Sequence, residues 1–253
     1  MLHEAAPWPT AVLVAALMAA AWGIGWRAGR AIRVRGEKPL ETKLDEAALA
    51  LLGLLLAFTF SMALNKYERR REAIVTDSNA IGDFYTCASL IPDPLRPRLQ
   101  AVIRDYTRLR LELGTLPSPS REDLARALAR FDEMHGRMTE LVGQAIVAGT
   151  PIAVPLTNTL NGVTSSQASR LAALRDRIPA SAAFLLAITA TLAAGLMGRD
   201  QGASPNPSLA GTAAFVLITA LTVGVTLDLN HPTAGVIRVS QEPMQRLLAS
   251  MGS

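Results

Sequence analysis

The side chains of this sequence that could carry out catalysis or bind a metal are few and scattered. The three histidines, His3, His135 and His231, lie far apart, and none has an acidic or cysteine partner at metal-ligand spacing. We interpret His135 as a solvated helix residue and His231 as an interfacial one. The single cysteine, Cys87, permits neither an internal disulfide nor a cysteine-based zinc site. We therefore expect no catalytic residue, no metal and no cofactor, and we do not expect an enzyme.

Ion conduction does not need a catalytic or metal-binding group, because side chains have only to surround a water-filled path. In the apolar segment 47–64, Ala50, Leu54 and Phe58 share one helical stripe at i, i+4 and i+8. A ring of such side chains about a symmetry axis forms an apolar constriction, which can gate ions by dewetting. An alternative stripe consists of Leu51, Phe58, Met62 and Asn65. Both stripes also fit ordinary contacts with lipid or with other helices, since every membrane span has apolar stripes.

Polar residues follow this segment in two groups, and we predict that they line a vestibule: Arg69, Arg70 and Arg71, and then Asp77, Asn79 and Asp83. The basic group would attract anions to a pore or, alternatively, contact lipid head groups. The second group needs partners or water if helices pack around it. A wet channel would supply that water.

The last apolar segment also carries polar groups. Four threonines share one of its faces, where they either contact another helix or line a water path: Thr212, Thr219, Thr222 and Thr226. Asp228 follows them at the rim. An ionisable group at membrane depth is a candidate functional residue, whereas at the rim it is simply hydrated. The sequence leaves both interpretations of Asp228 open.

The elements that must position these residues are membrane spans. Half of the residues are hydrophobic and only 18% are charged, whereas a soluble domain is about a quarter charged. The mean hydropathy is +0.26, and 25 basic residues exceed 21 acidic ones by only four. This composition excludes a disordered chain, a disulfide-rich secreted module and a basic nucleic-acid binder.

Four stretches approach the length of about 20 apolar residues that a helix needs to cross a bilayer; they are 7–26, 47–64, 179–198 and 209–227. The first also resembles a cleaved signal peptide, but no Lys or Arg precedes it and its apolar run is long for a signal core. Residues 202–208 are rich in Pro, Gly and Asn, so the last two spans form a hairpin. Basic residues flank the spans in similar number on both sides, which leaves the orientation open.

The segment between the second and third spans shows only helical patterns. Its apolar spacing continues that of the second span without a break, so we predict one helix over 47–90, about 65 Å long at about 1.5 Å per residue. Further helices are expected over 95–113, over 120–147 with Ser120 and Asp123 at its N-cap, and from about 156 to 177. The predicted domains are spans one and two (1–64), a cytoplasmic helical domain (65–178), a transmembrane hairpin (179–229) and an interfacial or cytoplasmic tail (230–253).

Two segments resemble the bacterial bestrophin-like proteins, a family once grouped as a domain of unknown function (DUF4239). The first is LLGLLLAFTFSMALNKYERRREAIVTDSNAIGDFY at 51–85, followed by LIPDPLRPRL, and the second is LDLNHPTAGVIRVSQEPM at 227–244. The resemblance covers nearly the whole chain, although its specific parts are these two segments. The similarity to true bestrophins is more distant and rests on four spans, a large helical region between the second and third, and a similar second span.

The resemblance implies an all-α integral membrane protein of the bestrophin type in the bacterial inner membrane, with both termini cytoplasmic. It implies a homo-oligomer, expected to be a pentamer, around a pore lined by the second span and its cytoplasmic extension. Matching to the bestrophin second span places the neck at Ala50, Leu54 and Phe58, of which two are aliphatic where a bulkier residue is expected. Only Asp228 lies where calcium-responsive bestrophins have an acidic clasp, so no calcium site is expected.

The function that follows is passive conduction of chloride or another small inorganic anion. The expected partners are further copies of the chain and membrane lipid, with no nucleic acid. The alternative is a non-conducting, membrane-anchored helical scaffold or sensor that binds a cytoplasmic partner.

Overall fold

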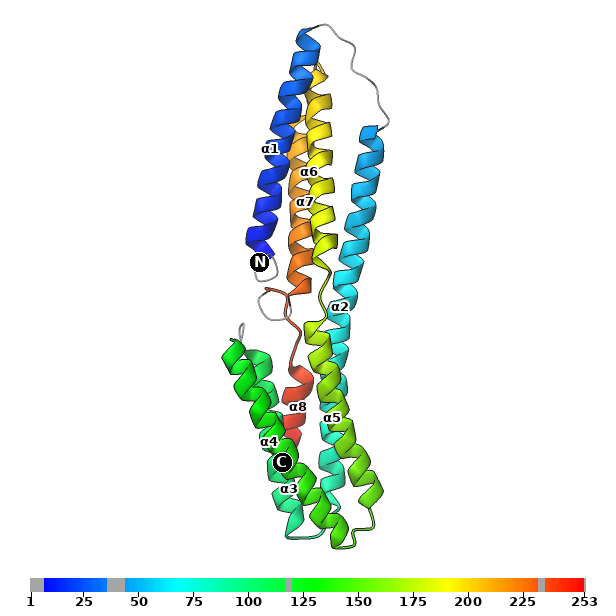
Figure 1. Cartoon of the computed structure of the whole chain (residues 1–253), viewed down its shortest axis with the longest axis vertical. Coiled ribbons are helices and arrows are strands. Elements are labelled where there is room, and N and C mark those ends of the chain that lie inside the picture. Colours follow the sequence, from blue (N-terminus) through cyan, green and yellow to red (C-terminus); the bar gives the residue numbers. More distant parts are fainter. Residues whose placement is uncertain (1–6, 36–43, 117–119, 232–234, 253) are drawn as a thin grey trace. The chain divides into compact units, whose positions relative to one another are not determined.

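The computed structural model describes residues 7–35, 44–116, 120–231 and 235–252, and every element within these ranges is a helix (Figure 1). In chain order the helices are α1 (Pro7–Val34), α2 (Leu44–Ser89), α3 (Leu95–Thr115), α4 (Arg121–Val147), α5 (Ala153–Arg175), α6 (Ala180–Ala203), α7 (Leu209–Asn230) and α8 (Glu242–Ser250). The predicted all-α class is confirmed.

Helix α2 is a single helix, as the sequence predicts. It contains no proline, and it ends shortly before Pro92 and Pro94. Proline lacks a backbone N–H and restricts the residue before it, which favours the end of a helix at this point. One helix therefore carries both the apolar segment and the polar residues that follow it.

The predicted N-cap of α4 is also confirmed. The Ser120 hydroxyl accepts a hydrogen bond from the Asp123 N–H at 3.0 Å, and the Asp123 carboxylate accepts one from the Ser120 N–H at 3.1 Å. These reciprocal bonds satisfy backbone donors that the first turn of a helix leaves free. The hydrogen bonds from Ser120 also lower the pKa of the Asp123 carboxyl.

Two elements differ from the sequence-based expectation. Helix α1 extends beyond the predicted span to Val34 and carries Arg27, Arg30 and Arg33, which were expected in the connection after it. Arginine and alanine are good helix formers, so the helix continues past its apolar part, and Arg33 donates to the carbonyl of Ser204 at 2.7 Å. Helix α8 was not predicted, since its nine residues are too short to show a clear periodic pattern.

Four helical stretches of the described residues are long and apolar enough to cross a membrane, and each matches one of the four predicted spans: Trp8–Val34, Glu46–Ser89, Ala153–Ala203 and Leu209–Asn230. The third stretch runs through α5 and α6, and the predicted span lies in α6. The chain is therefore an all-helical membrane protein.

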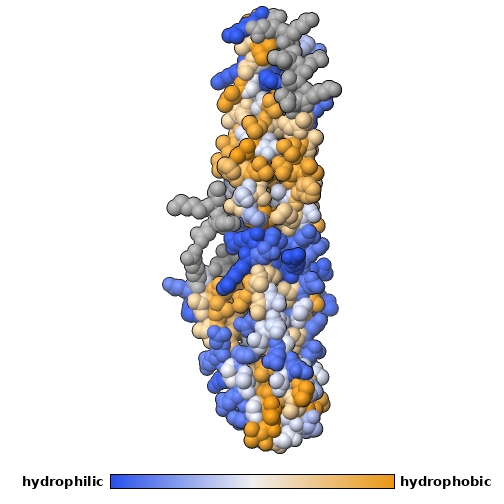
Figure 2. Space-filling model, turned by 45° about the vertical axis from the view of Figure 1, so that its right-hand side comes forward, coloured by the Kyte–Doolittle hydropathy of each residue, from blue (hydrophilic) through white to orange (hydrophobic). Residues whose placement is uncertain are grey.

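The chain forms two compact units. The first contains Met1–Lys66 and Arg177–Ile237, and the second contains Tyr67–Asp176 and Arg238–Ser253. The first unit thus includes α1, α6, α7 and the beginning of α2, and the second includes the rest of α2 with α3, α4, α5 and α8. Hydrophobic side chains cover much of the visible face of the first unit, whereas many hydrophilic ones cover the second (Figure 2).

Helices α1 and α6 of the first unit approach each other at backbone distance. A Cβ added at any of four glycines would overlap a carbonyl oxygen of the facing helix; these glycines are Gly25, Gly29, Gly198 and Gly202. Each pair is spaced by four residues, the small-xxx-small pattern with which membrane helices pack closely. The core beside this contact is also made partly of small residues, among them Ala190, Ala193 and Ala194.

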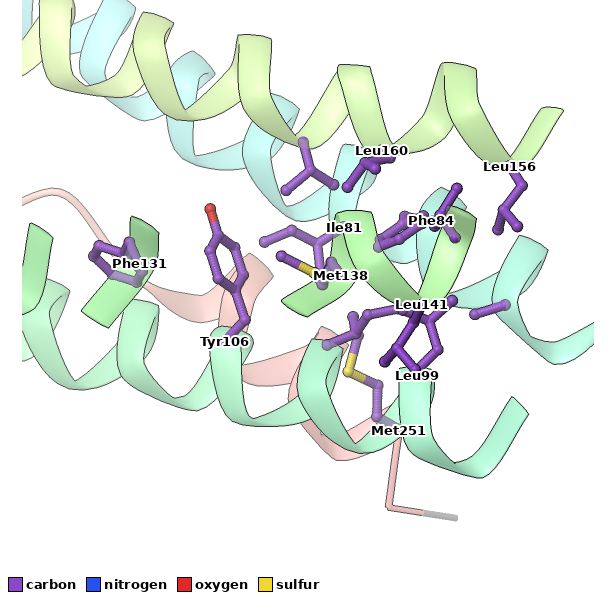
Figure 3. Packing of buried hydrophobic residues seen from close by; sticks show 14 of the residues in the cluster. Ile81, Phe84, Leu99, Tyr106, Phe131, Met138, Leu141, Leu156, Leu160 and Met251 are labelled. Carbon is purple, nitrogen blue, oxygen red and sulfur yellow. The ribbon is translucent and has the colours of Figure 1, made fainter. Parts of the chain in front are cut away.

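The core of the second unit is larger and includes aromatic side chains (Figure 3). Helix α2 contributes Ile81 and Phe84, both fully buried. Around them lie side chains from α3, α4, α5 and the C-terminal segment, including Leu99, Tyr106, Phe131, Met138, Leu141, Leu156, Leu160 and Met251. This core covers one side of α2 and leaves the other side exposed.

Candidate functional site

An exposed stripe runs along the whole of α2, and we call it the open face. Its residues recur every three or four positions and are all exposed: Ala47, Leu51, Leu54, Phe58, Ser61, Asn65, Glu68, Glu72, Thr76, Asn79, Asp83 and Thr86. That spacing follows the 3.6-residue turn of a helix. The buried residues of α2, such as Leu52, Ala63, Ile74, Ile81 and Phe84, lie on the opposite side.

The predicted constriction residues lie on or beside this open face. Leu54 is 53% exposed and Phe58 is 60% exposed, and Ala50 is exposed next to them. The alternative stripe is exposed too, since Leu51 is 50% exposed and Met62 39%. A single chain therefore leaves both stripes available, and the constriction at Ala50, Leu54 and Phe58 stays a prediction.

The vestibule candidates divide into two groups. Asn79 and Asp83 are exposed on the open face, and Arg69 and Arg71 are exposed beside it. At about 100° of rotation per residue, Arg69 lies about 60° and Arg71 about 100° around the helix from the centre of that face at Glu72. Arg69 also approaches Asp176 at 3.9 Å, an exposed pair that contributes little stability.

Arg70 and Asp77 differ from the expectation that they line a vestibule. Arg70 is 3% exposed and Asp77 is fully buried, both on the covered side of α2. About 160° and 140° of helical rotation separate them from Leu54, so they cannot share its face. Their assignment to the vestibule is corrected.

Asp77 is the centre of a buried ion-pair cluster in the second unit. Its Oδ2 accepts a hydrogen bond from Arg170 Nη1 at 2.9 Å, and its Oδ1 accepts bonds from Ser166 Oγ at 2.8 Å and from Arg110 Nη2 at 3.3 Å. Both arginine side chains are buried as well. One carboxylate therefore links α2 to α3 and α5.

Neutral groups complete this cluster. Tyr106 accepts a hydrogen bond from Arg110 Nη2 at 3.0 Å and donates one to Gln167 Oε1 at 3.0 Å. The Arg110 guanidinium also lies 4.7 Å from the centre of the Phe131 ring, a cation–π distance. Burial raises the pKa of the Tyr106 phenol, so it remains a neutral hydrogen-bond donor.

The cluster also reaches the C-terminal segment. Arg170 Nη2 donates to Gln241 Oε1 at 3.1 Å, and on α2 the Ser78 hydroxyl donates to the Pro243 carbonyl at 3.0 Å. Burial lowers the pKa of Arg170, while the charge of Asp77 opposes that effect. A guanidinium stays protonated in proteins, so two buried cations face one buried anion.

Asp228 in the first unit has a structural role. Its side chain is fully buried, and its two oxygens accept the N–H groups of Val236 at 2.9 Å and Ile237 at 2.7 Å. The carboxylate thus holds the chain that follows α7. This corrects the interpretation of Asp228 as a hydrated rim acid, because protein donors have replaced water.

The threonine face of α7 is mainly a helix contact. Thr212, Thr219 and Thr226 are buried, and Thr212 donates to Gln201 Oε1 of α6 at 2.6 Å. Thr222 donates to the carbonyl of Ile218 in its own helix. These observations favour helix packing over a water path for this face.

The histidines that the structure describes lie in separate units. His135 of the second unit lies 3.2 Å from the Thr164 hydroxyl, and His231 of the first unit lies at the end of α7. No group of three or more His, Cys, Asp or Glu side chains within the described ranges lies close enough to hold a metal. His3 lies outside the described residues.

Sequence reasoning missed two features that matter for the site. The glycine pairs of α1 and α6 follow a recognisable pattern and were detectable. The arginine partners of Asp77 were not, since they lie 33 and 93 residues farther along the chain.

The chain is similar in sequence to one protein family and in fold to solved structures. A family model described as the Bestrophin-like domain matches residues 46–244. A search of curated proteins found no match. Among solved structures, a single-substitution variant of a bacterial bestrophin homologue from Klebsiella pneumoniae aligns with a TM-score of 0.72 at 13% identity, over 97% of this chain and 98% of its own.

A second similar structure, described as a membrane protein variant, aligns with a TM-score of 0.65 at 13% identity, over 96% of this chain and 98% of its own. At this identity the likeness concerns the fold alone. The family model begins at residue 46 and so includes nearly all of α2.

Proposed function

This chain belongs to the Bestrophin-like family, and on that premise we propose that copies of it assemble into a passive ion channel whose pore is lined by the open face of α2. The predicted pentamer in a bacterial inner membrane, with cytoplasmic termini, belongs to this proposal. Leu54 and Phe58 would form the constriction, and the polar half of the open face would line the vestibule.

The observation that carries the proposal is the change in chemistry along the open face. From Ala47 to Phe58 the face is apolar, whereas from Asn65 to Thr86 it is polar or charged, and the whole of it is exposed. A helix face that contacted only lipid would place the polar second half in hydrocarbon, which is unfavourable. A face that only packed against protein would bury unpaired polar groups. An axial path that is dry at a constriction and wet elsewhere accommodates both halves.

The alternative function, a scaffold or sensor, requires the same face to be closed by packing. In that arrangement Glu72, Asn79 and Asp83 would lie buried between copies and would need partners there. The symmetry of detergent-purified particles separates the two functions. A ring with an axial hole supports the channel, and a dimer with a sealed interface supports the scaffold.

The constriction yields a first testable prediction. Phe58→Ala removes an exposed ring from the narrowest part of the proposed pore, so ion flux through reconstituted liposomes should rise severalfold. Phe60→Ala is the matched control, because Phe60 lies two residues along the same helix and therefore about 160° around it from Phe58. Flux should not change in that control.

If liposomes contain confirmed oligomer and yet pass neither anions nor cations, the proposed channel function is contradicted. Equal effects of Phe58→Ala and Phe60→Ala would contradict the assignment of the constriction to the open face.

The charge of the permeating ion follows from which side chains face the axis. The expected anion conduction depends on Arg69 and Arg71, which lie beside the open face. A specific observation favours a second candidate, cation conduction, because Glu68, Glu72 and Asp83 lie on the open face itself. Rings of acidic side chains favour cations, and rings of arginine favour anions.

Reversal potentials in a potassium chloride gradient give the second prediction. If the open face lines the pore, Glu72→Gln should shift the reversal potential toward that of chloride, while Glu133→Gln on α4 should leave it unchanged. If Arg69 and Arg71 dominate instead, the wild type should already reverse near the chloride potential, and Arg71→Gln should move it away.

A further inference from the structure

A cavity of about 530 Å³ lies within the first unit, lined by residues of α1, α2, α6 and α7. Its lining residues include the beginning of α1 and the end of α7, which lie at the same end of the first unit (Figure 1). Its volume lies within the range of about 300–1,000 Å³ that is usual for ligand pockets. Hydrocarbon side chains form most of its wall, including Leu13, Leu17, Phe184, Ile188, Leu192 and Val223.

Three of the four threonine hydroxyls in the wall donate hydrogen bonds within their own helices. Thr59, Thr191 and Thr226 each donate at 2.7 Å to the carbonyl oxygen four residues earlier. These threonines therefore present methyl groups, and hydroxyls whose hydrogens are already donated, to the cavity. The wall therefore suits a hydrocarbon ligand.

One polar side chain in the cavity wall differs from the rest. His231 lines the cavity, and its Nδ1 lies 2.8 Å from the carbonyl oxygen of Leu227, so Nδ1 carries the hydrogen and donates it. The neutral ring then has a lone pair on Nε2. That atom is buried and has no hydrogen-bond partner among the residues that the structure describes. A buried acceptor without a donor is unfavourable, and a ligand with an N–H or O–H group would satisfy it.

The position of the cavity indicates where such a ligand comes from. Leu13, Phe184 and Leu192 line it and are 53%, 62% and 61% exposed, so its mouth opens on the surface of the unit. For a membrane-spanning unit that surface faces lipid. No residue of the open face of α2 lines the cavity, so the cavity and the proposed pore are separate surfaces of the chain.

We propose that this cavity binds one acyl chain of a membrane lipid whose ammonium head group donates a hydrogen bond to Nε2 of His231. The site requires only that the first unit spans the membrane, and it does not depend on ion conduction.

The test uses the full-length chain in phosphatidylcholine vesicles that contain a phosphatidylethanolamine with a diazirine in its acyl chain. Irradiation followed by peptide mass spectrometry locates the adducts. Adducts at the cavity residues of α6 should saturate as the probe increases and should decrease when unlabelled phosphatidylethanolamine is added. Ala187→Trp, which fills the cavity, should lose these adducts. Ile24→Trp is the control, since Ile24 is 70% exposed on α1 and lies outside the cavity.

The head-group contact has its own readout. A phosphatidylcholine probe has no N–H donor, so the wild type should favour the phosphatidylethanolamine probe, and His231→Phe should lose that preference while still binding an acyl chain. Labelling of the cavity that never saturates would overturn the proposal. So would cavity residues that stay unlabelled while cross-links at the same positions join two copies of the chain. The wild-type saturation measurement decides the matter by itself if Ala187→Trp does not fold.

Discussion

Asp77→Asn should destabilise the full-length protein by about 3–5 kcal/mol, the usual cost of removing one partner from a buried ion pair. The substitution preserves the shape of the side chain and removes its charge. Arg110 and Arg170, both buried, then face each other across the cluster without a compensating anion. The measurement is thermal or denaturant unfolding of the purified protein in detergent, compared with the wild type.

Asp83→Asn is the matched control for this prediction. It makes the same chemical change on the same helix, but Asp83 is exposed on the open face. Surface substitutions of this kind usually change stability by less than about 0.5 kcal/mol. Equal unfolding midpoints for the two variants would contradict a stabilising role of the ion-pair cluster around Asp77. Combining Asp77→Asn with Arg170→Gln should cost less than the sum of the single substitutions, because the second change removes a charge that the first leaves unpaired.

Gly25→Ala should disrupt the packing of α1 on α6, although it adds only one methyl group. The new Cβ would overlap the carbonyl oxygen of Gly195, and a backbone atom cannot move aside as a flexible side chain can. The two helices must separate, so the expected loss of stability is at least the cost of about 1–3 kcal/mol that is typical of overpacked cores. Gly25→Ala combined with Gly198→Ala should be worse than either change alone.

Gly23→Ala on the same helix gives the opposite expectation. A Cβ at Gly23 meets no atom within 4 Å, and alanine is the better helix former by about 1 kcal/mol. This control should therefore be neutral or slightly stabilising when unfolding is followed in detergent. A similar loss in both variants would contradict close approach of α6 as its cause, because Gly23 has no neighbour to overlap and helix propensity favours alanine at both positions.

The positions of the site residues show how far sequence reasoning can reach. The prediction of one helix over 47–90 also determines which residues share a face, because the helix turns by about 100° per residue. On that basis Asn79 and Asp83 lie within about 20° of Leu54, whereas Asp77 lies about 140° away. The same arithmetic separates Arg70 from the pore candidates. The error at these two positions came from grouping residues by proximity in sequence.

The role of Asp228 and the presence of α8 are structural features that local sequence patterns do not predict. The spacing around Asp228 shows an acid at the end of a span, but its partners are backbone N–H groups eight and nine residues later. Helix α8 is a short segment whose buried Met244 packs into the core of the second unit. Asp228 depends on the course of the loop after α7, and α8 depends on packing against helices that are distant in the chain.

The amino-acid sequence by itself determined the all-helical class, the four membrane spans, the uninterrupted α2 and the Ser120–Asp123 cap. These features arise from interactions between residues a few positions apart and from the cost of placing polar groups in lipid. The tertiary structure alone decided which side of α2 is covered, how two arginines meet Asp77, and where α1 and α6 enclose a cavity. Such features depend on packing between helices that are far apart in sequence, and the spacing within one helix can indicate a packing face but does not identify the partner helix.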